Sequence, residues 1–180
     1  DAMPAYRAPA ARTAPDADAI GRAVELLRQA KRPGLFVGWG AKGAAAELVQ
    51  LAELMEAPVA TTLQGLGVFP GDHPLHTGLA FGASAVPAGQ NAFADCDLML
   101  AIGTKFSELG TGFFFSAEVP KDLIHVDINP DSFNQNYSAR EAIAGDAEMV
   151  ATALLRSLGN DGGAGIRARG GAELRAGIAT

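Results

Sequence analysis

Short apolar runs, set between segments with helical spacing, constrain the fold of this chain more than any other feature. The segments 35–37, 97–102 and 123–127 are rich in Leu, Ile, Val, Met and Phe, which favours strands buried on both faces. Between them, segments such as 18–30 place apolar residues at the spacing of one helix face. Buried strands that alternate with helices are typical of an α/β fold with helices on both faces of a parallel sheet.

The complete prediction is a doubly wound, mainly parallel sheet of the Rossmann-like, nucleotide-binding type. We expect strands at 35–37, 59–62, 97–102, 123–127 and 142–144. We expect helices at 18–30, 41–56, 83–95 and 147–158, a helical turn at 131–136 and a long loop at 65–82. Ligands of such sheets bind at the carboxyl ends of the strands, so the candidate binding residues are those that follow each strand.

The chain is interpreted as one domain with a linker on each side. Residues 18–158 carry the strand and helix patterns and are expected to form the central α/β domain. Residues 1–17 are rich in Pro and Ala and are interpreted as a linker from an upstream domain. Residues 159–180 are rich in Gly and are interpreted as a flexible linker to a downstream domain.

Composition excludes several classes of protein. The chain has 14 Lys and Arg against 20 Asp and Glu, a net charge of −6, which argues against binding to nucleic acid or to an anionic membrane. One cysteine, Cys96, excludes a disulfide framework and a zinc site built from several cysteines, and it fits a cytoplasmic location. No apolar stretch approaches the roughly 20 residues that a transmembrane helix needs.

A glycine motif follows the first predicted strand. Residues 38–43 read G-x-G-x-x-G between a strand and a helix, which is the context of a dinucleotide-binding turn. In that interpretation Gly38 makes the tight turn, Gly40 lets the backbone approach a phosphate, and the helix amino end faces the anion. A tight turn without a ligand is the alternative. The second strand ends in Thr61 and Thr62 rather than in an acidic residue, which argues against ordinary NAD-dependent hydride transfer.

Five segments of the chain form a recognisable series: 38–40, 58–75, 97–103, 124–131 and 145–146. Taken in this order, they resemble the central domain of thiamine-diphosphate-dependent enzymes, and most of all the acetolactate synthase group. The resemblance covers residues 18–158. It implies a whole subunit of three α/β domains, in which the outer two bind thiamine diphosphate and magnesium. It implies that the central domain holds FAD without redox work, or ADP, or no ligand.

The resemblance also implies a cofactor-binding set at the carboxyl ends of the strands and no catalytic residue or metal ligand in this chain. The set places the diphosphate or ribose near the glycine turn, and the adenosine half near the later strands. Two departures leave FAD, ADP and no ligand as alternatives: residues 79–83 replace a Met-His-Gly segment, and Lys105 replaces an arginine, which loses the planar bidentate fork. The candidate residues are Gly38, Trp39, Gly40, Thr61, Thr62, Gly65, Gly103, Lys105, Asp127, Ile128 and Asp146.

Other reactive side chains are interpreted as structural. His73 lies in a turn sequence and is expected to fix a loop, and His125 lies within a strand and is expected to be packed or paired. Cys96 stands beside two aspartates, which raise a thiol pKa, so no reactive thiol is expected. Residues 113–115 are three phenylalanines, interpreted either as a plug under a loop or as a contact with a neighbouring domain or subunit.

The sequence therefore predicts a non-catalytic central domain of an enzyme that acts on 2-keto acids as a carboligase or decarboxylase. Its expected partners are the flanking domains of the same chain and further copies in a homo-oligomer. By itself the fragment is expected to be inactive. The alternatives are a free module that binds ADP or FAD and a purely structural inter-domain module. A sirtuin-type deacylase has a similar fold, but the single cysteine argues against its zinc site.

Overall fold

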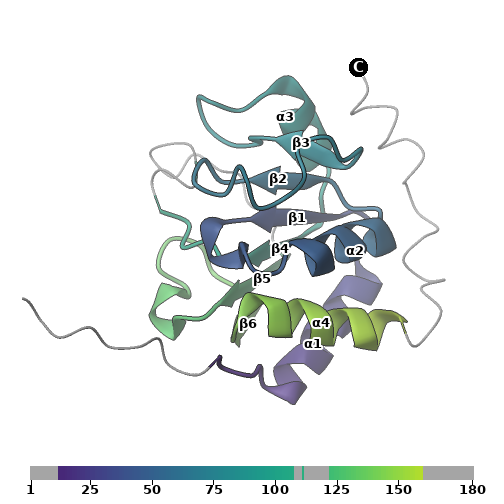
Figure 1. Cartoon of the computed structure of the whole chain (residues 1–180), viewed down its shortest axis with the longest axis vertical. Coiled ribbons are helices and arrows are strands. Elements are labelled where there is room, and N and C mark those ends of the chain that lie inside the picture. The colour runs from purple at the N-terminus through teal and green to yellow at the C-terminus, as the bar shows by residue number, and fades with distance from the viewer. Residues whose placement is uncertain (1–11, 108–110, 112–121, 160–180) are drawn as a thin grey trace, which may run out of the picture.

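The protein is described by a computed structural model, which places residues 12–107, 111 and 122–159 (Figure 1). All six strands of its sheet are parallel and lie in the order β3-β2-β1-β4-β5-β6. This is a doubly wound order, and it confirms the predicted fold class. The strands are β1 (Pro33–Val37), β2 (Val59–Thr61), β3 (His76–Gly78), β4 (Leu98–Ile102), β5 (Asp122–Asp127) and β6 (Glu141–Ala144).

Helices cover both faces of the sheet. One face packs against α1 (Ala17–Gln29), α2 (Ala45–Met55) and α4 (Ala147–Gly159), and the larger apolar core lies between them and the strands (Figure 1). The other face packs against α3 (Pro87–Ala94) and includes Phe36, Met99 and Phe106. Alternate residues of β1, β2, β4 and β5 enter the two cores, which is why these strands are mostly apolar.

The first helix begins where the sequence indicates. The carboxylate of Asp16 accepts a hydrogen bond from the Ala19 amide at 3.2 Å and caps α1. Residues Ile20, Val24 and Leu27 are buried on one face of the helix. Ahead of α1, the carbonyl of Thr13 accepts a hydrogen bond from the Asp146 amide, so the chain before the helix lies along the start of α4.

Several predicted boundaries were wrong. The loop expected at 65–82 contains β3, a three-residue strand at the sheet edge whose sequence, His-Thr-Gly, has no apolar run. Two helices begin four residues later than predicted, α2 at Ala45 and α3 at Pro87, where proline suits the first turn. The helical turn predicted at 131–136 is the shorter 3₁₀ turn η2 (Pro130–Ser132). None of the described helices is long and apolar enough to cross a membrane.

Candidate functional site at the carboxyl edge of the sheet

The carboxyl ends of β1 and β4 meet at the centre of the sheet, where the strand order reverses. This is where ligands of doubly wound folds bind. Here the turns that follow the two strands contact each other directly. The Gly38 amide donates to the Ile102 carbonyl at 2.9 Å, and the Gly40 amide donates to the Gly103 carbonyl at 3.0 Å. The two turns therefore close on each other through their backbones.

Glycine is required on both sides of this contact. A Cβ atom on Gly38 would lie 2.2 Å from the Gly103 carbonyl oxygen, and one on Gly40 would lie 2.9 Å from the Gly103 Cα. Gly103 itself has a φ of +66°, and its Cβ would lie 2.4 Å from the Ala41 nitrogen. The motif indicated a close approach of the backbone to a phosphate. In the structure, the glycine turn instead approaches the turn after β4.

The glycine turn does not lead straight into a helix. Residues Trp39–Ala41 form the 3₁₀ turn η1, and the amides of Ala41, Lys42 and Ala44 all donate to main-chain carbonyls. The helix that follows begins four residues after the predicted start, and Ala44 gives it no side-chain cap. Most amides of the turn are therefore already hydrogen-bonded within the chain.

The end of β2 supports the same turn. The Thr62 amide donates to the Val37 carbonyl at 2.9 Å, and the Thr62 hydroxyl accepts from the Gly65 amide at 3.0 Å. A Cβ on Gly65 would lie 2.8 Å from the Val37 carbonyl oxygen. Thr61 is buried, and its hydroxyl has no hydrogen-bond partner among the described residues. The structure thus places Thr61, Thr62 and Gly65 beside the glycine turn.

The ends of β5 and β6 place two carboxylates at the same edge. Asp127 is buried, and its carboxylate accepts from the Asn129 amide at 2.8 Å. Asp146 caps α4, because its carboxylate accepts from the Glu148 and Met149 amides at 3.1 and 3.3 Å. The Gly145 amide donates to the Asp127 carbonyl at 3.1 Å and joins the two strand ends.

Exposed apolar side chains gather at this edge. Trp39 follows β1 and is 57% exposed, and the ammonium of Lys42 lies 4.8 Å from the centroid of its ring. In the part of the chain that the structure describes, every large exposed hydrophobic side chain follows the carboxyl end of a strand. We call Trp39, Leu63, Leu66, Val86 and Ile128 the apolar rim. Sequence reasoning missed Leu63, Leu66 and Val86, although their place in loops after predicted strands was a usable signal.

Lys105 lies in the turn after β4, and its side chain is exposed. Its neighbours Thr104 and Phe106 are buried, and Phe106 has a φ of +50°. The turn therefore anchors the residues on either side of Lys105 and presents the lysine to solvent. Lys105 thus lies at the carboxyl edge of the sheet.

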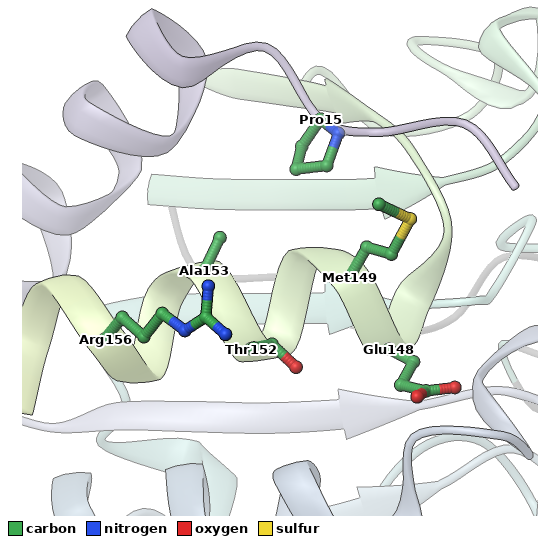
Figure 2. A pocket seen from close by; sticks show the side chains of 6 residues that line it. All are labelled: Pro15, Glu148, Met149, Thr152, Ala153 and Arg156. Carbon is green, nitrogen blue, oxygen red and sulfur yellow. The ribbon is translucent and has the colours of Figure 1, made fainter.

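A separate hollow lies beside α4 and is lined by none of the predicted site residues (Figure 2). It has a volume of about 320 Å³, and Figure 2 shows Met149 pointing toward Pro15 across it. Glu148 and Arg156 of α4 also belong to its lining. Among the described residues, no group of three or more His, Cys, Asp or Glu side chains is arranged to hold a metal ion.

The side chains interpreted as structural have structural contacts. Burial, with a further contribution from Asp97, raises the pKa of the Cys96 thiol to about 12, which is the direction expected from the sequence. His73 accepts from the Leu75 amide at 3.2 Å through Nδ1 and so fixes its own turn. The three phenylalanines at 113–115 lie outside the described residues.

Comparisons with known proteins show what this chain is similar to. The family model "Thiamine pyrophosphate enzyme, central domain" matches residues 20–154. The "Probable acetolactate synthase large subunit" of Methanocaldococcus jannaschii is 40% identical over 143 residues, covering 77% of this chain and 24% of that protein. The "Sulfoacetaldehyde acetyltransferase" of Rhodobacter capsulatus is 37% identical over 168 residues, covering 91% of this chain and 28% of that protein.

A solved structure shares the fold. The benzoylformate decarboxylase of Polynucleobacter necessarius superposes with a TM-score of 0.69 at 21% identity, over 87% of this chain and 30% of that one. The chain thus spans about a quarter of the length of the relatives it matches. Because the family match includes every strand and most of every helix, this chain belongs to the family of thiamine pyrophosphate enzyme central domains.

Proposed function

We propose that this chain is the non-catalytic central domain of an acetolactate synthase-like enzyme that acts on 2-keto acids. The observation that carries the proposal is the family match over residues 20–154, together with the relative from Methanocaldococcus jannaschii. Thiamine diphosphate, held with magnesium by other domains, would stabilise the carbanion that forms when a 2-keto acid loses carbon dioxide. Cys96, Asp127 and Asp146 are each engaged within the fold, which supports a non-catalytic role for these three side chains.

In this proposal the domain contributes contact surfaces for its neighbours and holds them at a fixed distance from each other. Its partners are the flanking thiamine-diphosphate-binding domains of the same chain and further copies of the whole subunit. The apolar rim supports contact with another group or domain, because exposed apolar side chains that gather at one edge favour burial.

A pair of assays tests this role. The chain alone, supplied with thiamine diphosphate, magnesium and pyruvate, is expected to consume no pyruvate above a protein-free blank. A chimera is then made in which residues 18–158 replace the matched segment of the Methanocaldococcus jannaschii protein. It is expected to consume pyruvate only when thiamine diphosphate is present. Activity of the chain alone, or a folded chimera that lacks activity, would contradict the proposal.

A second candidate function is the binding of ADP or FAD at the carboxyl edge. The exposed Trp39 ring with Lys42 beside it specifically favours this, because an aromatic ring and an ammonium suit a base and a phosphate. The residues fit a nucleotide only in part, since the amides of the glycine turn are already hydrogen-bonded. A bound nucleotide would therefore be held by Trp39, Lys42, Lys105 and Asp127, and the glycine turn would contribute little.

Fluorescence provides a direct test, because Trp39 is the single tryptophan of the chain. ADP or FAD is titrated into the chain and the emission of Trp39 is recorded. Saturable quenching that weakens in Lys42→Ala supports nucleotide binding at this edge. No change in emission up to millimolar ligand, with no nucleotide detected by mass spectrometry of the purified protein, would leave the purely structural role.

A further inference from the structure

His125 lies inside the protein between two aromatic rings. It belongs to β5 and is only 1% exposed. Its ring makes edge-to-face contacts with Phe106 and Phe133, with centroids 5.0 Å away in each case. Phe106 belongs to the turn after β4, and Phe133 follows η2. The ring therefore connects a central strand to two loops at the carboxyl edge.

The contacts of the ring fix its tautomer. Nε2 lies 2.7 Å from the Thr104 carbonyl oxygen, and a carbonyl oxygen can only accept, so Nε2 carries the proton. Nδ1 then presents a lone pair. It is buried and has no hydrogen-bond partner among the described residues. A second proton on this ring would consequently have no acceptor there.

The carbonyl that His125 holds belongs to a turn with an unusual backbone. Gly103 and Phe106, at the two ends of the turn, have φ values of +66° and +50°. Within it the Phe106 amide donates to the Thr104 hydroxyl at 3.3 Å. The Asn136 side-chain amide donates to the Phe106 carbonyl at 3.0 Å. Two side chains from outside, His125 and Asn136, thus hold the turn in this conformation.

We propose that His125 is an acid-sensitive tether that holds the turn 103–106 at neutral pH and releases it when Nδ1 is protonated. Release would free Lys105, which this turn presents at the candidate binding edge, and would loosen the contact of Gly103 with the glycine turn. Protonation of Nδ1 leaves the Nε2–H bond to Thr104 in place, so release comes from the cost of burying a charged ring whose second N–H group lacks an acceptor, a cost that opening to water removes. The proposal does not depend on which ligand or domain covers this edge.

The charged surroundings of the ring do not supply that acceptor. Asp127, two residues along β5, acts on His125 electrostatically and favours the charged form. The turn 103–106 contributes Lys105, whose side chain is exposed, and η2 contributes Asp131, also exposed. The Tyr137 ring packs against Phe106, with centroids 5.1 Å apart. Among the described groups, burial therefore outweighs the attraction of Asp127.

The direction of the pH effect follows from burial. Burial lowers the pKa of His125 below its ordinary value of 6.5, while the bond to Thr104 and the charge of Asp127 act the other way. The folded chain therefore binds this proton less readily than the unfolded chain. The contribution to stability is complete above pH 6.5 and falls as the pH decreases from 6.5 toward the folded-state pKa.

The test measures the turn directly by NMR on the 180-residue chain, without cofactor or substrate. The exchange of the Phe106 amide, corrected for intrinsic exchange, is compared at pH 7.5 and pH 5. Nitrogen chemical shifts of His125 report its tautomer. His125→Gln keeps a donor for the Thr104 carbonyl but cannot titrate, whereas His125→Phe keeps the packing and loses the donor. Asn136→Ala removes the other tether as a matched control.

The proposal expects the parent chain to protect the Phe106 amide at least tenfold better at pH 7.5 than at pH 5. His125→Gln should keep that protection at both pH values. His125→Phe should lose it at both, and Asn136→Ala should weaken protection but retain the pH dependence. The proposal is overturned if His125→Gln shows the same pH dependence as the parent, or if nitrogen shifts show a proton on Nδ1 at pH 7.5. If His125→Phe fails to fold, His125→Gln and Asn136→Ala still test whether protonation of His125 releases the turn.

Discussion

At the scale of single residues, many of the predicted binding positions have contacts within the fold. Gly38, Gly40 and Gly103 let two turns approach each other, and Asp146 caps a helix. Sequence reasoning placed these residues at one edge because they follow parallel strands. It could not show that Gly40 faces Gly103, because the two are far apart in sequence and the contact depends on the order of the strands.

Gly40→Ala is expected to destabilise the chain by about 1–3 kcal/mol, because its Cβ would overpack the turn after β4. Gly67→Ala is the matched control. A Cβ there meets nothing within 4 Å, so the change in the free energy of unfolding should stay within about 0.5 kcal/mol. Urea denaturation of both variants measures the difference. Equal stabilities would show that the turns separate at little cost.

At the scale of helices and strands, the sequence predicts an element well where one pattern dominates. The buried strands β1, β4 and β5 were found because short apolar runs dominate them. The edge strand β3 was missed because its three residues have neither an apolar run nor alternation. The start of α2 was misplaced because residues 41–44 suit a helix, while the backbone there is held in the 3₁₀ turn.

The start of α4 provides a test of one element. Asp146→Ala removes the acceptor for the Glu148 and Met149 amides and is expected to lower the free energy of unfolding by about 1 kcal/mol. Asp146→Asn keeps an acceptor oxygen and should lose less than half of that. Thermal and urea unfolding without added nucleotide make the comparison. If asparagine is as harmful as alanine, charge rather than capping sets the stability, and the ion pair with Arg12 becomes the cause to examine.

At the scale of the whole molecule, the carboxyl edge differs from the rest of the described surface because the large exposed apolar side chains, those of the apolar rim, lie there. The fold class and the edge that carries the site were predictable, because strand order and direction follow from the pattern of elements. The rim was only partly predictable. Exposure of Leu63 and Leu66 depends on how the loop after β2 lies over Thr62 and Gly65, which no local pattern specifies.

Exposed rim residues should bind a hydrophobic dye. The parent chain is expected to enhance the fluorescence of anilinonaphthalene sulfonate while its near-ultraviolet circular dichroism stays that of a folded protein. The double variant Leu63→Ser, Leu66→Ser should reduce the enhancement by at least half without changing the unfolding midpoint, because both side chains are about half exposed. An unchanged signal would mean that the dye binds elsewhere, for example in the hollow beside α4.

The contact between the turns after β1 and β4 also affects how substitutions combine. Either Gly40→Ala or Gly103→Ala forces the two backbones apart, and once they have separated, the second methyl group meets less resistance. The double variant should therefore lose less stability than the two single losses added together, with a coupling of about 0.5–3 kcal/mol in a double-mutant cycle. The two turns are therefore coupled. A side chain in one turn costs less stability when the other turn already carries one.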